Sequence, residues 1–155
     1  MSIERTGLDG DLPNGTIAVI ASRYNPAICD SLVQAAVKTL LEAGFETHQV
    51  IVVRVPGAWE LPLVSKKMIA KAGVIGVVTL GCVIKGETTH DEHINRAVST
   101  SLMQLSLDTE IPIGFGLLTC NTVEQALQRS GGNVGNKGEE AAGAVVELLR
   151  LTAKL

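Results

Sequence analysis

The segment Val74–Ile84 constrains the fold more than any other part of this sequence. Its centre, Val77-Val78-Thr79-Leu80, is β-branched and apolar without the alternation of a half-exposed strand, which is typical of a strand buried on both faces. Such strands occur almost only in parallel sheets covered by helices on both sides. The segment therefore predicts an α/β fold, and the loop after it lies where ligands bind in open α/β sheets.

Strand-like and helix-like segments alternate along the whole chain. Strands are expected at residues 16–21, 47–55, 74–84 and 111–118, and helices at residues 26–43, 60–72, 90–107, 123–128 and 139–153. Because crossovers between parallel strands are right-handed, this order predicts a three-layer α/β/α sandwich with a four-stranded parallel sheet, flavodoxin-like in strand order. Pro112 at the start of the last strand predicts that this strand lies at a sheet edge.

Length and composition fit one globular domain. With 155 residues, the chain is expected to form a single domain over residues 1–155, in which about residues 1–14 are a mobile N-terminal segment. Hydrophobic residues make up 46% and charged residues 19%, and the longest apolar stretch is too short to cross a bilayer. The opening segment lacks the basic start and apolar centre of a signal peptide, so we expect a cytoplasmic protein.

Charge and hydropathy indicate which partners to expect. The net charge is −3, no Lys/Arg cluster is present, and aromatic residues make up only 3%, so neither nucleic acid nor a membrane is an expected partner. A mean hydropathy of +0.29 predicts that part of the surface is buried between subunits. The three cysteines, Cys29, Cys82 and Cys120, form no C-x-x-C pair and are expected to be small buried hydrophobes.

Four loops are expected to meet at the carboxyl edge of the sheet: residues 22–25, 55–60, 82–90 and 118–121. The chain has one Tyr and one Trp, and both Tyr24 and Trp59 fall in these loops, which indicates a surface on which a flat ring could stack. For Trp59, a role as a core anchor at the start of a helix fits the sequence equally well.

The loop that follows Val74–Ile84 carries a candidate anion site. Glu87, Thr88 and Thr89 precede a helix that begins near His90, where unpaired backbone N–H groups and the hydroxyls form a phosphate cradle. Ordinary N-capping by either threonine is the alternative. The helix dipole disfavours an imidazolium at His90, so the neutral ring could accept a proton near pH 7, although a structural histidine is equally consistent.

A metal site at this loop is not favoured. His90 and His93 lie three residues apart with Glu87 and Glu92 nearby, but the spacing is not H-E-x-x-H and no cysteine is suitably placed. A histidine on a solvent-facing helix position is commoner than a metal ligand.

The glycine-rich segment, residues 130–138, resembles a phosphate loop only superficially. It lacks the Gly-Lys-Ser/Thr ending and has no strand before it, so a nucleotide site is not expected there. Arg129 and Lys137 flank the segment, and the residues alone give them no role beyond solvated surface charges.

Taken together, the motifs resemble the lumazine synthase family, whose members catalyse the penultimate step of riboflavin biosynthesis. The similarity extends over residues 15–151 and rests on motifs that occur in the order typical of the family: Arg23-Tyr-Asn25, Val55-Pro-Gly-Ala-Trp-Glu-Leu-Pro62, Gly81, Ile84-Lys-Gly-Glu-Thr-Thr-His90, Pro112, Phe115-Gly-Leu-Leu-Thr119, Glu124-Gln-Ala126, Arg129 and Gly135-Asn-Lys-Gly138.

The resemblance implies a reaction that needs no cofactor and no metal. It is the condensation of 5-amino-6-ribitylaminouracil with 3,4-dihydroxy-2-butanone 4-phosphate to 6,7-dimethyl-8-ribityllumazine, with release of water and phosphate. Tyr24 then matches the family's stacking aromatic residue. Further contacts to the pyrimidine and ribityl chain fall on Ala58, Trp59, Glu60 and, through their backbone, Cys82, Val83 and Ile84.

The same resemblance assigns the phosphate contacts and the proton carrier. His90 matches the family's proton carrier, while Phe115 and Arg129 match residues that a neighbouring subunit contributes to the site. Contacts to the butanone phosphate fall on Glu87, Thr88, Thr89, Arg129 and, as a weaker match, Lys137. Departures from the common pattern are Tyr24 for Phe, an unusual cysteine at Cys82, and Asp91 and His93 at positions that are often aromatic.

The resemblance also implies a homo-oligomer. Family sites lie between adjacent subunits of a pentamer, and a short segment between Arg129 and Lys137 resembles that of members whose pentamers close into an icosahedral shell of sixty subunits. Such a shell could enclose riboflavin synthase. Three alternatives stay open on the sequence: a flavin-binding module, an archaeal-type riboflavin synthase, and a cage whose main role is enclosing another protein.

Overall fold

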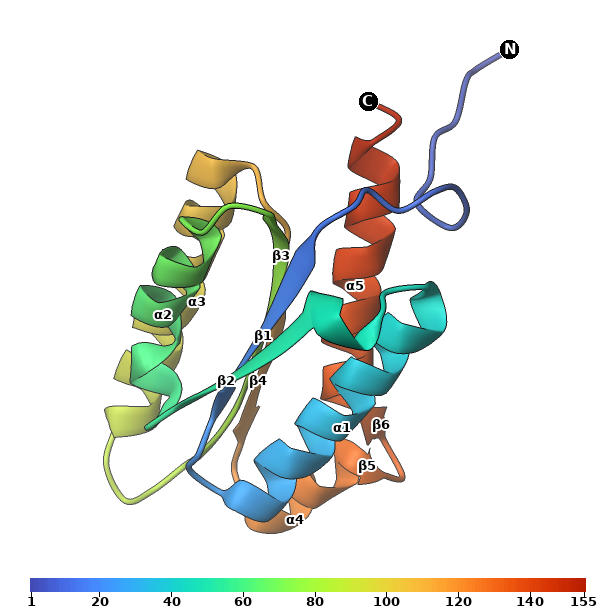
Figure 1. Ribbon diagram of the computed structural model, residues 1–155. Coiled ribbons are helices and arrows are strands. Elements are labelled where there is room, and N and C mark those ends of the chain that lie inside the picture. Colours follow the sequence, from blue (N-terminus) through green and yellow to red (C-terminus); the bar gives the residue numbers. More distant parts are fainter.

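The centre of the molecule is a four-stranded parallel sheet, shown in Figure 1 by a computed structural model that describes residues 1–155. The strands are β1 (Thr16–Ser22), β2 (Val50–Val55), β3 (Val74–Ile84) and β4 (Ile113–Cys120). Their order is β2-β1-β3-β4, and each neighbouring pair is parallel. The predicted α/β/α sandwich with flavodoxin-like strand order is confirmed, as is the edge position of the strand after Pro112.

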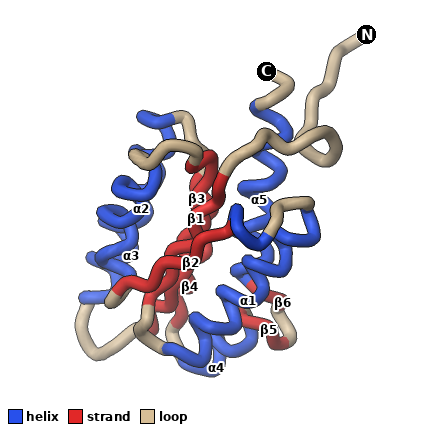
Figure 2. Tube along the Cα trace, viewed as in Figure 1, coloured by secondary structure: helices blue, strands red, loops and turns tan.

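Helices cover both faces of the sheet. The main helices are α1 (Pro26–Ala43), α2 (Leu61–Ile69), α3 (His90–Thr109), α4 (Val123–Gln128) and α5 (Lys137–Thr152). Figure 2, which views the sheet nearly edge-on, shows α1 and α5 on one side and α2 and α3 on the other. None of the helices has the length and apolar character needed to span a membrane.

The two faces of the sheet bury separate apolar clusters. Along β1, Ile17 and Val19 point into the cluster under α1 and α5, while Ala18 and Ile20 point into the cluster under α2 and α3. All of these side chains are fully buried. A strand covered on both sides needs apolar residues at every position, which explains why the sequence of β1 and the centre of β3 shows no polar alternation.

The N-terminal segment contains no helix or strand before Thr16. It is attached to the end of α5 through Lys154, whose Nζ donates to the backbone oxygens of Thr6 and Asp9 at 2.9 and 2.8 Å. The same ammonium lies 2.7 Å from Asp9 Oδ1, and this hydrogen bond lowers the pKa of the Asp9 carboxyl. The two ends of the chain therefore lie side by side, as Figure 1 shows.

The structure differs from the sequence-based expectation at the second strand and second helix. The strand expected at residues 47–55 begins only at Val50, because Thr47–Gln49 form a 3-10 helix, η1. The side chains of Glu46 and Gln49 cap that turn reciprocally, and Gln49 Oε1 accepts from the Glu46 N–H at 2.9 Å. The helix expected at residues 60–72 ends at Ile69 and is preceded by a second 3-10 turn, η2 (Ala58–Glu60).

The C-terminal third differs in two further respects. The strand expected at residues 111–118 runs from Ile113 to Cys120, because Pro112 has no N–H to donate to the ladder. The glycine-rich segment forms a short antiparallel hairpin, β5 (Ser130–Gly132) and β6 (Gly135–Asn136), which was not predicted. The last helix begins at Lys137, two residues early, because Asn136 Oδ1 accepts the N–H groups of Gly138 and Glu139 as a cap.

Gly114 allows β4 to approach α5 closely. A Cβ atom at this position would overlap Ala141 O and lie 3.0 Å from a Val145 methyl group. We predict that Gly114→Ala lowers the free energy of unfolding by about 1 to 3 kcal/mol, because the strand or helix must shift to accept the methyl group. The measurement is chemical denaturation of the purified variant.

Gly143 supplies the matched control for this prediction. It lies in the same helix that Gly114 contacts, and a Cβ atom there would meet no atom within 4 Å. Gly143→Ala is expected to raise the free energy of unfolding by about 0.5 to 1 kcal/mol, since alanine is the better helix former. Equal effects of the same sign in the two variants would contradict the close approach of β4 and α5.

Candidate functional site

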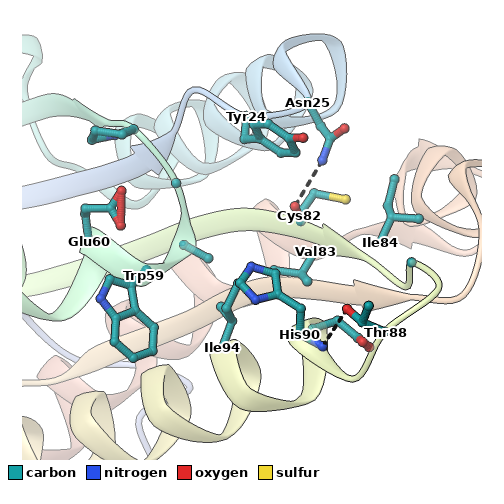
Figure 3. Close-up of a pocket in the computed structure, with 15 residues that line it drawn as sticks. Tyr24, Asn25, Trp59, Glu60, Cys82, Val83, Ile84, Thr88, His90 and Ile94 are labelled. Atoms are coloured by element: carbon teal, nitrogen blue, oxygen red, sulfur yellow. Dashed lines mark hydrogen bonds between the residues drawn. The ribbon is translucent and has the colours of Figure 1, made fainter.

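A cavity of about 680 Å³ lies at the carboxyl ends of the first three strands. Residues from three of the four predicted loops meet there, as Figure 3 shows, while the loop after β4 does not contribute. The lining residues are Tyr24, Asn25, Pro56, Gly57, Ala58, Trp59, Glu60, Cys82, Val83, Ile84, Gly86, Thr88, His90, Asp91 and Ile94.

Two exposed aromatic side chains line this cavity. The side chain of Tyr24 is 71% exposed and that of Trp59 is 61% exposed, so neither ring belongs to the core. The reading of Trp59 as a core anchor at a helix start is therefore wrong. Large exposed rings beside a cavity are available to stack on a flat ligand.

The backbone of Tyr24 is fixed even though its ring is free. The Tyr24 N–H donates to Ser22 Oγ at 3.0 Å, and the Cys29 thiol donates to the Tyr24 carbonyl at 3.1 Å. The preceding N–H, of Arg23, donates to Val55 O at 2.8 Å and ties the loop to the end of β2. These three bonds hold the point from which the tyrosine ring projects.

The end of β3 presents an open backbone edge to the cavity. β1 pairs with β3 only as far as Leu80, so the next residues have no strand on that side. The Lys85 N–H donates to Cys120 O at 2.8 Å, which places the polar groups of Lys85 on the β4 side. Because successive residues point their N–H and C=O groups to opposite sides of a strand, those of Cys82 and Ile84 face the cavity.

We call the segment from Cys82 to Ile84 the open edge of β3. Paired donors and acceptors on a strand edge can bind another strand, or the amide edge of a flat heterocycle that offers the same pattern. The open edge and the exposed tyrosine ring together form a slot suited to a planar polar ring.

His90 is the first residue of α3 and lines the cavity. Figure 3 shows its imidazole rising from the helix start toward the open edge of β3. The His90 N–H donates to Thr88 Oγ1 at 3.3 Å. An exposed imidazole on a helix start, with no side chain of the chain bound to it, is free to exchange a proton with a ligand.

The threonines at this helix start do not both act as caps. Thr89 occupies the N-cap position but makes no side-chain cap bond, and its Oγ1 lies 3.5 Å from His93 Nε2. Thr88 lines the cavity, whereas Glu87 and Thr89 are exposed beside it without lining it. The predicted phosphate segment is thus adjacent to the cavity but only partly within it.

Three of the predicted site residues lie elsewhere. Phe115, Arg129 and Lys137 line a separate hollow of about 410 Å³ along the β4 edge, which shares no residue with the first cavity. Phe115 is 41% exposed although it is a large aromatic residue. Within one chain, the structure therefore divides the predicted site residues between two surfaces.

The main cavity is lined by acidic side chains but by no lysine or arginine. Glu60 and Asp91 contribute the carboxylates. A phosphate dianion placed there would meet Thr88, His90 and the start of α3, but no lysine or arginine of the same chain. The two cations of the predicted site, Arg129 and Lys137, lie in the second hollow.

Six residues that line the cavity were not among the predicted site residues: Asn25, Pro56, Gly57, Gly86, Asp91 and Ile94. Ile94 follows His90 by four positions, and this helical spacing would have identified it. Asn25 was part of the expected loop and of the Arg23-Tyr-Asn25 motif, but no role was assigned to it. Asp91 has a shielded Oδ1 with no hydrogen-bond partner in the chain, a feature that only the three-dimensional structure reveals.

The three cysteines are buried and free, as predicted. Burial raises the pKa of Cys29 to about 11 and that of Cys82 to about 12, and it also raises the pKa of Cys120. Because the thiolate is the reactive form, we predict that a disulfide reagent at pH 8 labels the native protein only slowly, and that all three thiols react at once in denaturant.

The pH dependence of stability follows with a defined sign. The pKa of these thiols is higher in the folded state than the value near 9 in the unfolded state. The resulting stabilisation is fully present below pH 9 and is lost as the pH rises toward the folded-state pKa values of about 11 and 12. The free energy of unfolding should therefore fall above about pH 9.

The labelling experiment has a clear contrary outcome. Rapid labelling of native protein at pH 8 would show that these thiols are accessible and not buried.

The fold and the cavity define a class of protein: a doubly wound α/β domain with a slot for a planar polar ring at the carboxyl ends of its strands. Comparison with protein-family models gives a match to 6,7-dimethyl-8-ribityllumazine synthase over residues 14–153. The chain therefore belongs to the 6,7-dimethyl-8-ribityllumazine synthase family.

Individual relatives agree with the family match. A 6,7-dimethyl-8-ribityllumazine synthase from Rhodopirellula baltica is 61% identical over 149 residues, which cover 96% of each chain. The proteins of the same name from Desulfovibrio desulfuricans and Stenotrophomonas maltophilia are each 42% identical. These alignments cover 90% and 95% of this chain and 89% and 97% of the relatives, respectively.

Proposed function

We propose that this protein is an active 6,7-dimethyl-8-ribityllumazine synthase. It condenses 5-amino-6-ribitylaminouracil with 3,4-dihydroxy-2-butanone 4-phosphate and releases water and phosphate. The observation that carries the proposal is the cavity itself, in which an exposed ring, an open strand edge and a histidine converge in a chain that belongs to this family.

The pyrimidine binds in the slot between Tyr24 and the open edge of β3. Its ring stacks on the tyrosine, and its amide edge bonds to backbone groups of Cys82 to Ile84. The ribityl hydroxyls bind to residues 56–60, which line the neighbouring part of the cavity. Glu60 is the only charged residue in that segment. In this segment Ala58, Trp59 and Glu60 make the proposed contacts.

His90 moves protons during the reaction. Imine formation, phosphate elimination and ring closure each need a proton to be taken up or released, and an imidazole does both near neutral pH. Figure 3 shows this ring directed toward Val83 at the end of β3, beside which the pyrimidine would lie. Alignment of two bound substrates supplies much of the remaining acceleration.

A neighbouring subunit completes the phosphate site. No lysine or arginine lines the cavity, whereas the other hollow is lined by the exposed Phe115 and Arg129 and by the half-buried Lys137, so the second surface has the cations that the first lacks. In a ring of subunits each cavity would face the β4 edge of the next chain. Glu87, Thr88 and Thr89 would then bind the phosphate from one side and Arg129, with Lys137, from the other.

The proposed assembly is a pentamer, which we expect to close into an icosahedral shell of sixty subunits. Exposed apolar side chains support burial between subunits: Leu63, Met103 and Leu107 on α2 and α3 are each more than 60% exposed. Riboflavin synthase as an enclosed partner stays a prediction. The mass of the purified particle by light scattering decides between pentamer and shell.

Genetic complementation tests the proposed activity in cells. The gene is expressed in a bacterial strain that lacks its own lumazine synthase and needs riboflavin to grow. Growth without riboflavin is expected from the native chain, and no growth is expected from an empty vector. Absence of growth despite soluble expression would contradict the proposed activity.

A further inference from the structure

Asn25 has a backbone conformation that costs stability. With φ 56° and ψ 63° it lies in the left-handed region, and only one other non-glycine residue, Glu110, has a positive φ. Asparagine tolerates this region better than most residues, but the conformation still requires support from the surrounding structure. Strained residues of this kind cluster at functional sites, and Asn25 lines the cavity.

The Asn25 side chain does not perform its usual task. The residue occupies the N-cap position of α1, where an asparagine normally accepts a backbone N–H of the first helical turn. Here the side chain makes no such bond. Both the residue type and the position are suited to helix capping, yet the Asn25 side chain does not cap α1. This side chain is therefore expected to have another hydrogen-bond partner.

That partner is the open edge of β3. Asn25 Nδ2 donates to Cys82 O over 3.1 Å, a contact that joins residues 57 positions apart, and Figure 3 shows it across the top of the cavity. Pairing between β1 and β3 has already ended at Leu80. The amide therefore ties the β1 loop to β3 beyond the last backbone contact between the two strands.

This tie fixes the geometry of the proposed ring slot. Ser22 and Cys29 hold the backbone of Tyr24, and the Cys29 thiol of α1 also lies beside the backbone of Cys82. The Asn25 bond is the direct link between the loop that carries the tyrosine and the edge that faces it. It thereby sets the distance between the stacking ring and the backbone groups of the open edge.

We infer that Asn25 is a positioning residue of this site, which acts through Cys82 to hold the slot at the width of one planar ring. The inference rests on the proposed function, because the ring in question is the pyrimidine of ribitylaminouracil. Its consequence is selective: affinity for the pyrimidine substrate depends on Asn25, and affinity for the butanone phosphate does not.

Two substitutions distinguish the effect of the Asn25 hydrogen bond on substrate binding from an effect on folding. Asn25→Gly removes the amide and relieves the left-handed strain, so the melting temperature should change little. Asn25→Asp keeps the shape and replaces the donor with an oxygen that faces Cys82 O, so it should disturb the slot more. We expect the KM for ribitylaminouracil to rise roughly fivefold to tenfold in the glycine variant and further in the aspartate variant.

Gln49 supplies the control. Its Nε2 donates to Gly15 O at 3.0 Å, an equivalent amide-to-backbone tie at the opposite end of the sheet. Gln49→Ala should leave the KM values for both substrates unchanged. In the Asn25 variants the KM for the butanone phosphate should stay within about twofold of the native value.

Each outcome has one meaning. An active native enzyme whose pyrimidine KM is unchanged in both Asn25 variants would overturn the inference alone. So would equal increases in both KM values, or the same increase in Gln49→Ala, because these indicate a general structural effect. A native chain that forms no lumazine would remove the proposed function, and this inference with it.

Discussion

Replacement of His90 by alanine lowers kcat for lumazine formation by roughly a hundredfold. General acid–base catalysis by a placed side chain typically contributes about 10² to 10⁴ in rate, and the lower end applies here because both substrates stay aligned without the imidazole. The KM values should change little, since stacking and backbone contacts lie on other residues. Steady-state kinetics at saturating substrates measures the effect.

His93 and His48 are the matched controls for this prediction. His93 lies one turn further along α3 and does not line the cavity, and His48 lies on η1 beside Glu46 at 3.3 Å. Alanine at either position should leave kcat within about twofold of the native value. Because His90 is exposed, its replacement should not unfold the protein. A His90→Ala variant with native kcat would contradict the proton-transfer role.

Replacement of Arg129 by alanine raises the KM for the butanone phosphate roughly tenfold to a hundredfold. A guanidinium that binds a phosphate dianion makes charge-assisted hydrogen bonds, and the cavity has no lysine or arginine that could take its place. Within its own chain the Arg129 side chain donates only to Gln125 O, at 3.3 Å, so its loss should affect the fold little. The KM for ribitylaminouracil should remain near the native value.

Mixing the two variants tests whether sites are shared between subunits. If His90 comes from one subunit and Arg129 from the next, random co-assembly of His90→Ala and Arg129→Ala chains restores about a quarter of the sites. The variants are unfolded together and refolded, or co-expressed. The activity is measured at a butanone phosphate concentration near the native KM, at which Arg129→Ala sites are largely empty, and is compared with that of each variant alone. Activity no greater than the sum of the separate variants would place both residues in the same subunit.

The sequence predicted the fold well where burial sets the pattern. Val74–Ile84 was located to the residue, because a strand covered on both faces must be apolar throughout, and α4 was located equally well. Failures lie where local side-chain bonds decide. The η1 turn depends on reciprocal bonds of Glu46 and Gln49, and the early start of α5 depends on Asn136, neither of which hydrophobic periodicity can detect.

The site was predictable only in part, for a different reason. Parallel strands bring their carboxyl ends to one edge, so the convergence of Tyr24, Trp59 and His90 follows from topology. Arg129 lies on the other surface of the same subunit, and only the resemblance to a family with shared sites joins it to them. The Asn25 bond to Cys82 links positions far apart in the chain, and no spacing rule predicts such a contact.

The measurement that tests the proposed function most directly is to mix the purified native protein with ribitylaminouracil and the butanone phosphate and to follow lumazine formation by absorbance and fluorescence. A blank without protein gives the spontaneous rate. We predict product formation well above the blank, with one phosphate released per lumazine formed. A rate equal to the blank, from protein that is folded and assembled, would contradict the synthase activity and would favour flavin binding or enclosure of another protein.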